Sequence, residues 1–138
     1  MSGPPLNTDR RKRVLLVEDD STNRLLFTDY LSRQSYQVMA LPDGTTLLEE
    51  IERFQPDVLL IDVGLPYIDG LTLLRRLRAI PRWQNLPAIV MSTYVFQSDY
   101  EPVASSSIKY YLAKPVRLEN LSSLLKQLLS ENDPEATT

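Results

Sequence analysis

Short apolar runs alternate with amphipathic segments along most of this 138-residue chain. The runs are too short for helices and indicate buried strands, which we place at about 13–17, 37–41, 58–61, 88–91 and 110–113. Between them, helical spacing of apolar residues predicts helices that begin at 21 or span about 45–54, 71–80, 98–106 and 118–129. Because neighbouring parallel strands need crossover connections, this alternation predicts an α/β fold with a doubly wound, five-stranded parallel sheet.

Two of the predicted helices have distinctive sequence features. In the first, Leu25, Leu26, Tyr30 and Leu31 recur at helical spacing and predict its apolar face. The helix near 98–106 has the weakest pattern, because Pro102 falls at the end of its first turn and a run of serines follows. We therefore expect that helix to be short and loosely held.

The two ends of the chain are polar and lack this periodicity. We predict an N-terminal tail over 1–11, one domain over 12–130 and a C-terminal tail over 131–138. The basic run at 10–13 is interpreted as a solvated edge or linker, with an interaction patch as the alternative.

Composition narrows the chemistry that this domain can carry. The net charge of −3 argues against nucleic acid as the main partner, since that binding depends on basic patches. Neither a membrane-length apolar run nor a signal-peptide core is present, so we expect a cytoplasmic protein without membrane contact. The absence of cysteine and histidine excludes disulfides, thiol nucleophiles, Cys/His zinc sites and histidine-based catalysis. Carboxylate, hydroxyl, lysine, tyrosine, backbone and a hard metal ion remain.

Polar side chains follow four of the predicted strands, at the point where each strand ends. They are Glu18-Asp19-Asp20, Asp62, Ser92-Thr93 and Lys114-Pro115. Because open α/β sheets place their ligand sites at the carboxyl ends of the strands, we expect these side chains to form one site.

The residues at this edge suit phosphoryl chemistry. A carboxylate such as Asp62 can act as the nucleophile toward a phosphoryl group and form an aspartyl phosphate. Glu18, Asp19 and Asp62 crowd negative charge, which is unfavourable without a cation. An all-oxygen donor set suits Mg2+.

Each residue also has an interpretation without chemistry. The acidic pair Glu18-Asp19 is compatible with a solvated turn, and Asp62 with a helix cap. Lys114 is compatible with a surface lysine and Ser92 with a satisfied hydroxyl. We expect Asp20 to face solvent or to cap the first helix rather than to bind metal.

The order of these motifs resembles that of the response-regulator receiver domain of two-component signalling. The motifs are the acidic pair, the strand ending in Asp62, the loop Asp62-Val63-Gly64-Leu65-Pro66-Tyr67-Ile68-Asp69-Gly70, the Ser92 hydroxyl and Lys114-Pro115. The resemblance covers about residues 12–130. It implies a flavodoxin-like sheet of order 2-1-3-4-5 with five helices.

The resemblance also implies roles for individual residues. Asp62 would be the phosphoacceptor. Mg2+ would be bound directly by Asp19 and Asp62, through water by Glu18, and by the Gly64 backbone carbonyl. The phosphoryl group and the switch would involve Ser92, Thr93, Lys114 and Tyr111, and a cis peptide would precede Pro115.

The function implied is that of a phosphoacceptor switch. The phosphoryl group would come from a histidine kinase or histidine phosphotransfer protein, and a protein target would bind the face made by helix four, strand five and helix five. Two copies pairing through that face is a further expectation. The chain would be no enzyme beyond catalysing its own phosphorylation and dephosphorylation. The alternatives are a receiver cut from a hybrid kinase or larger regulator, and a non-phosphorylated adaptor.

Three residues at the site depart from the usual receiver pattern or tune it. Thr93 adds bulk where receivers usually have alanine or glycine, Tyr94 is placed to cover the acyl phosphate, and Gly64 has no side chain to orient a hydrolytic water. We therefore predict slow self-dephosphorylation. Gly64 also argues against a haloacid-dehalogenase-type phosphohydrolase, which needs an acid there, and the few glycines argue against a flavodoxin-like cofactor binder.

Overall fold

The apolar runs form a parallel sheet in the computed structural model, which describes residues 11–93 and 109–131. Its strands are β1 (Arg13–Val17), β2 (Gln37–Leu41), β3 (Val58–Asp62), β4 (Ala88–Ser92) and β5 (Tyr110–Ala113). They lie in the order β2-β1-β3-β4-β5, and every neighbouring pair is parallel. The predicted fold class and strand order are confirmed.

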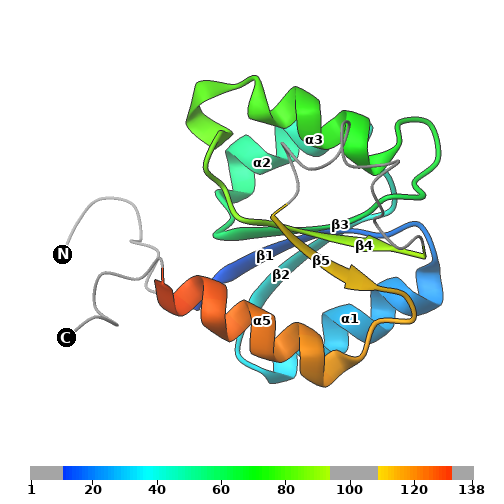
Figure 1. Ribbon diagram of the computed structural model, residues 1–138, viewed down its shortest axis with the longest axis vertical. Helices are drawn as coiled ribbons and strands as arrows, with labels where there is room; N and C mark the ends of the chain where they lie inside the picture. The colour runs from blue at the N-terminus through cyan, green and yellow to red at the C-terminus, as the bar shows by residue number, and fades with distance from the viewer. Residues whose placement is uncertain (1–10, 94–108, 132–138) are drawn as a thin grey trace, which may run out of the picture.

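Helices cover both faces of the sheet. The described residues contain α1 (Ser21–Arg33), α2 (Leu47–Phe54), α3 (Gly70–Arg78) and α5 (Leu118–Glu131). Helices α2 and α3 lie on one face, and α1 and α5 lie on the other (Figure 1). The helix predicted near 98–106, Tyr94 and residues 1–10 and 132–138 lie outside the described residues.

Alternate residues of each strand enter two separate cores. On β1, Leu15 and Val17 pack toward α2 and α3, whereas Val14 and Leu16 pack toward α1 and α5. Because both faces are covered, β1, β3 and β4 are apolar almost without interruption. This double burial explains why the strands could be located from their sequence.

The apolar face of α1 differs from the prediction. Phe27 and Leu31 are buried and Tyr30 is partly buried, but Leu25 is 72% exposed and Leu26 is 49% exposed. The helix carries two apolar stripes, and the sheet covers only the one that contains Phe27 and Leu31. Leu25 and Leu26 are left on the surface.

Two helix boundaries also differ from expectation. Helix α2 begins at Leu47 rather than Thr45, because the Asp43 carboxylate accepts hydrogen bonds from the Thr45 backbone N–H (2.8 Å) and hydroxyl (2.5 Å) and holds a turn there. Helix α3 ends at Arg78, and a 3-10 turn, Pro81–Trp83, follows it. Pro81 begins that turn, since proline has no N–H to continue the hydrogen bonding of α3.

Candidate phosphoacceptor and metal site

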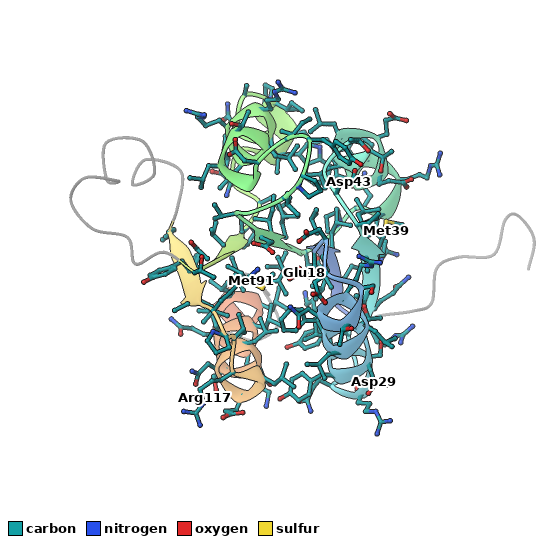
Figure 2. All side chains as sticks on the ribbon, turned by 90° about the vertical axis from the view of Figure 1, so that its right-hand side faces the viewer. Glu18, Asp29, Met39, Asp43, Met91 and Arg117 are labelled. Carbon is teal, nitrogen blue, oxygen red and sulfur yellow. The ribbon has the colours of Figure 1, made fainter. Side chains whose placement is uncertain are left out.

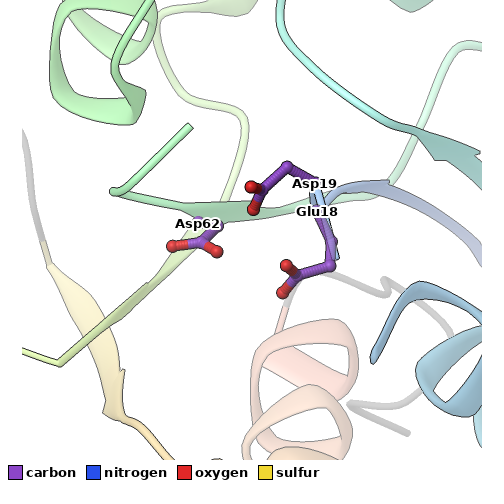
Figure 3. Close-up of side chains that lie close together, drawn as sticks. All are labelled: Glu18, Asp19 and Asp62. Carbon is purple, nitrogen blue, oxygen red and sulfur yellow. The ribbon is translucent and has the colours of Figure 1, made fainter. Parts of the chain in front are cut away.

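Three carboxylates meet at the carboxyl ends of β1 and β3. Because Val17 pairs with Ile61 in the parallel register, the next residues, Glu18 and Asp62, come to lie beside each other. Oxygens of Glu18, Asp19 and Asp62 lie within 4.8 Å of one another. Figure 3 shows the three carboxylates directed toward a shared space. The predicted acidic cluster is therefore present.

Asp62 is recessed and both of its carboxylate oxygens have partners. The residue is 2% exposed. Its Oδ1 accepts a hydrogen bond of 3.0 Å from the Gly64 backbone N–H, and its Oδ2 forms a close ion pair with Lys114 Nζ. The side chain is thus held in one orientation at the floor of the site, with a lysine already beside it.

Glu18 is fully buried and only partly satisfied. Its Oε2 accepts a hydrogen bond of 3.1 Å from the Asp20 backbone N–H, whereas its Oε1 has no hydrogen-bond partner among the described residues. Lys114 Nζ lies 4.0 Å from Oε1, too far for a hydrogen bond. Burial, together with the nearby charge of Asp62, raises the pKa of Glu18 to about 7, against the smaller opposing effects of the Asp20 N–H and Lys114.

These features fit a divalent cation. The donors are all oxygens, which Mg2+ prefers, and one buried oxygen of Glu18 has an unused lone pair. Three carboxylates around one space also face only one lysine among the described residues that line it. A bound cation would compensate that excess of negative charge.

The turn that carries the acidic pair is fixed by Arg24, which the sequence analysis did not single out, and by Asp20. Arg24 NH1 donates hydrogen bonds to the backbone oxygens of Glu18 (2.8 Å) and Asp19 (3.2 Å). Asp20 Oδ1 accepts a 2.9 Å hydrogen bond from the Asn23 backbone N–H, so Asp20 caps α1 as expected. The sequence signal for this role of Arg24 is its position in the first turn of the helix that follows the acidic pair.

A pocket of about 220 Å³ opens above Asp62. It is lined by Asp19, Asp62, Val63, Gly64, Ser92, Thr93 and Lys114. The structure therefore brings together the predicted phosphoacceptor, one of the acidic pair, the hydroxyl residues and the lysine. A second hollow of about 390 Å³ adjoins it on the α1 side, lined by Glu18, Asn23, Leu26, Phe27, Thr93, Lys114, Pro115 and Val116.

The other candidate residues lie in or just after β4 and β5. Ser92 is buried at the end of β4, and Thr93 is exposed beside it. Tyr111 is partly buried against the core on the α2–α3 side. The peptide bond between Lys114 and Pro115 is cis, as expected. Figure 2, which faces this edge, shows Glu18 near the centre between the two helix layers.

Gly70, which the sequence analysis names only as the last residue of the loop after Asp62, is a positioning residue. A Cβ at this position would lie 2.3 Å from the Asp62 backbone oxygen and 3.0 Å from Val63 Cα. The Gly70 N–H also donates a 3.0 Å hydrogen bond to the Val63 oxygen. The start of α3 therefore packs directly on the backbone of Asp62.

A sequence model of the response regulator receiver domain matches residues 14–126. The chain belongs to this family. The receiver-domain chain is 32% identical to an uncharacterized 14.6 kDa protein of Leptolyngbya boryana, over 89% of this chain and 94% of that protein. It is 25% identical to the polar-differentiation response regulator DivK of Brucella anthropi, over 87% of this chain and 98% of DivK.

Solved structures show the same relationship. The receiver domain of the sensor histidine kinase PA1611 from Pseudomonas aeruginosa matches with a TM-score of 0.77 and 30% identity, over 86% of this chain and 97% of that one. That structure has a magnesium ion coordinated in its active-site cleft. The receiver identity implies a phosphoacceptor role in two-component signalling for this chain. No helix in the described part of the chain is long and apolar enough to cross a membrane.

Proposed function

We propose that this receiver takes a phosphoryl group from a histidine kinase or histidine phosphotransfer protein onto Asp62, with Mg2+ bound at the acidic cluster. The observation that carries the proposal is the recessed Asp62 carboxylate, held between the Gly64 N–H and Lys114 and faced by Glu18 and Asp19. A carboxylate so placed has a lysine ready for the incoming phosphoryl group and two acids ready for a cation.

The chain's own residues account for most of the transfer step. An Asp62 carboxylate oxygen attacks phosphorus, the phosphorus–nitrogen bond of the phosphohistidine breaks, and the imidazole nitrogen leaves with the electron pair. Lys114 then exchanges its Asp62 partner for a phosphoryl oxygen, and the Ser92 hydroxyl donates to another. Positioning and charge neutralisation are the general means of catalysis in phosphoryl transfer.

Mg2+ would be held by Asp19, Asp62 and the Gly64 carbonyl, with Glu18 acting through water. The ion would supply neutralisation of the negative charge that collects when two anionic groups approach. The magnesium-containing PA1611 receiver domain supports this assignment, as does the unused oxygen of Glu18.

Mg2+ is expected to raise the melting temperature of the wild-type protein, and Asp19→Asn should remove most of that increase. The reason is that the variant loses a charged ligand at the shared space of the cluster. Thermal unfolding with and without Mg2+ measures the effect. Asp29→Asn is the matched control, because Asp29 is a surface acid of α1 that pairs with Arg33. An Mg2+ response that is equal in Asp19→Asn and wild type would contradict the ligand assignment.

The phosphodonor would dock on the exposed stripe of α1. Leu25 and Leu26 are exposed. Leu26 lines the second hollow, which is also lined by Glu18 of the acidic cluster and by Thr93 and Lys114 of the pocket above Asp62. A protein that brings a phosphohistidine to Asp62 would cover this apolar surface, which supports a protein rather than a small molecule as the natural donor.

Phosphorylation would change the conformation of Ser92 and Tyr111. A protein target would then recognise the altered face made by helix four, β5 and α5. The proposal also includes pairing of two copies through that face. It further includes a cytoplasmic location and no enzymatic activity beyond self-phosphorylation and self-dephosphorylation. Thr93, Gly64 and Tyr94 are the basis for predicting slow loss of the phosphoryl group from Asp62. The half-life of the aspartyl phosphate tests this prediction.

Phosphoramidate with Mg2+ should add one phosphoryl mass to the wild-type protein and none to Asp62→Ala. Intact-protein mass spectrometry measures this, with chelation of the metal as the second control. Labelling that persists in Asp62→Ala would refute the choice of phosphoacceptor. A wild-type protein that takes no phosphoryl group would favour the adaptor alternative.

A further inference from the structure

Tyr67 occupies an unusual backbone conformation in the loop between β3 and α3. Its φ is +70°, and the Ile68 N–H donates a 2.8 Å hydrogen bond across it to the Pro66 oxygen. A hydrogen bond from residue i+2 to residue i, around a central residue with positive φ, is the γ-turn that is rare and strained for L-amino acids. Glycine adopts this conformation with little cost, and a bulky aromatic residue does not.

The two other non-glycine residues with positive φ in the described chain have ordinary structural explanations. Ser35 closes α1, where its N–H donates to Ser32 and the next N–H donates to Leu31. Gln55 closes α2, where its N–H donates to Ile51 and its side chain donates to Glu52. Left-handed residues commonly terminate helices in this way. Tyr67 terminates no helix.

The side chain of Tyr67 does not hold the loop in place. It is 84% exposed, and it makes no hydrogen bond, ion pair or ring contact with the residues that the structure describes. The loop is fixed by other groups: Gly70 N–H bonds to Val63, Asp69 caps α3, and Ile68 packs on the core. Among the described residues, the fold therefore gains no contact from the Tyr67 side chain, and a bulky residue held in a strained conformation points to function.

Tyr67 also stands at the edge of the molecule where phosphoryl transfer would occur. Val63 and Gly64, in the same loop, line the pocket above Asp62. Among the described residues, the large hydrophobic side chains that are exposed are Tyr67, Leu25 and Leu26, and all three lie at the carboxyl edge of the sheet. In the described part of the chain, the large exposed hydrophobic side chains thus lie at the edge that carries the acidic site.

We propose that Tyr67 is an anchor for the histidine-bearing domain that phosphorylates Asp62, and that it helps to select which donor domains dock. The inference rests on the proposed function. Asp62 is recessed, so a phosphohistidine can reach it only if the donor's surface covers the rim of the pocket. A tyrosine ring supplies a large amphipathic contact with few rotatable bonds, and tyrosine is enriched among the residues that dominate binding at interfaces.

The test compares a protein donor with a small donor. Autophosphorylated histidine kinases and phosphotransfer domains of the source organism are first compared, and the one that phosphorylates the wild-type chain most rapidly serves as the protein donor. The small donor is phosphoramidate. Tyr67→Gly should lower kcat/KM for the protein donor by about tenfold, mainly through KM, which is the effect of removing one strong interface contact. Labelling by phosphoramidate should stay within about twofold of wild type, because a small donor enters the pocket without a docking surface.

Ser35→Gly is the matched control, because it relieves the same kind of backbone strain at the opposite edge of the sheet. It should leave transfer from both donors unchanged, and neither glycine variant should lower the free energy of unfolding. Tyr67→Phe, which keeps the ring, should transfer nearly as fast as wild type.

The outcomes separate this inference from the proposed function. Equal protein-donor transfer to Tyr67→Gly and wild type overturns the anchor, as does equal slowing with both donors, since that would place the effect in the pocket. Failure of every protein donor to phosphorylate the wild type overturns it as well. Failure of phosphoramidate to label the wild type would instead overturn the proposed function itself.

Discussion

Gly70→Ala is expected to slow Mg2+-dependent phosphorylation of Asp62 by about tenfold to a hundredfold. The new Cβ would lie 2.3 Å from the Asp62 backbone oxygen and 3.0 Å from its carbonyl carbon, and backbone atoms of a central strand have no room to retreat. The end of β3 must shift, and the carboxylate moves with it, away from Lys114 and the acidic pair. Overpacking of this kind also costs about 1–3 kcal/mol of stability.

Gly44→Ala provides a control of equal size. Its Cβ would also meet an atom at 2.3 Å, but that atom is the Cδ2 of Leu73, the far end of a side chain that can rotate. Gly44→Ala should therefore lower stability without slowing phosphorylation. Unfolding followed by fluorescence of Trp83, the single and buried tryptophan, measures the first effect, and the rate of labelling by phosphoramidate measures the second. Wild-type labelling of Gly70→Ala would show that α3 does not position Asp62.

Glu18→Gln is expected to stabilise the Mg2+-free protein near pH 8. Burial and the charge of Asp62 raise the pKa of Glu18 from 4.5 to about 7, so the folded protein binds the proton more tightly than the unfolded chain does. The free energy of unfolding must then fall as the pH rises from about 4.5 to about 7, by about 3 kcal/mol at most. Above that range the buried charge is present in full, and an uncharged amide of the same shape avoids it.

Denaturant unfolding without Mg2+, repeated between about pH 5 and pH 8, measures this dependence. Glu18→Gln should flatten the fall, and Mg2+ should offset it in the wild type, because the ion stabilises the ionised Glu18 carboxylate through a bound water. Glu119→Gln is the control, because Glu119 is an exposed acid of α5 paired with Arg117 and should leave the fall in place. The same slope in Glu18→Gln and wild type would contradict the assigned pKa.

The site was predictable because its chemistry stands at the ends of apolar strands. Parallel strands buried on both faces have a sequence pattern that locates their ends closely. Glu18 and Asp19 follow β1, and Asp62 and Ser92 are the last residues of β3 and β4. Lys114 follows the edge strand β5, which is only partly buried. Because the strands are parallel, their carboxyl ends lie at the same edge of the sheet, and these side chains therefore come together there. The strand order came from family resemblance, since the alternation of strands and helices is compatible with more than one order.

The features that were missed depend on distances between segments. Leu25, Leu26, Phe27 and Leu31 are all apolar residues of α1, and only packing on the sheet decides which of them are buried. Likewise, an Asp-Gly pair indicates a turn, but its close approach to Asp62 appears only in three dimensions. The strain at Tyr67 has the same origin, because a tyrosine in a loop gives no sign of its φ.

Chemical trapping of the phosphorylated residue would identify the phosphoacceptor of this receiver. After phosphoramidate treatment with Mg2+, borohydride reduces an aspartyl phosphate to homoserine, and peptide mass spectrometry then locates the converted residue. We expect homoserine at position 62 and none at position 18 or 19. Conversion at another carboxylate, or a labelled protein with no converted residue, would show that Asp62 is not the phosphoacceptor.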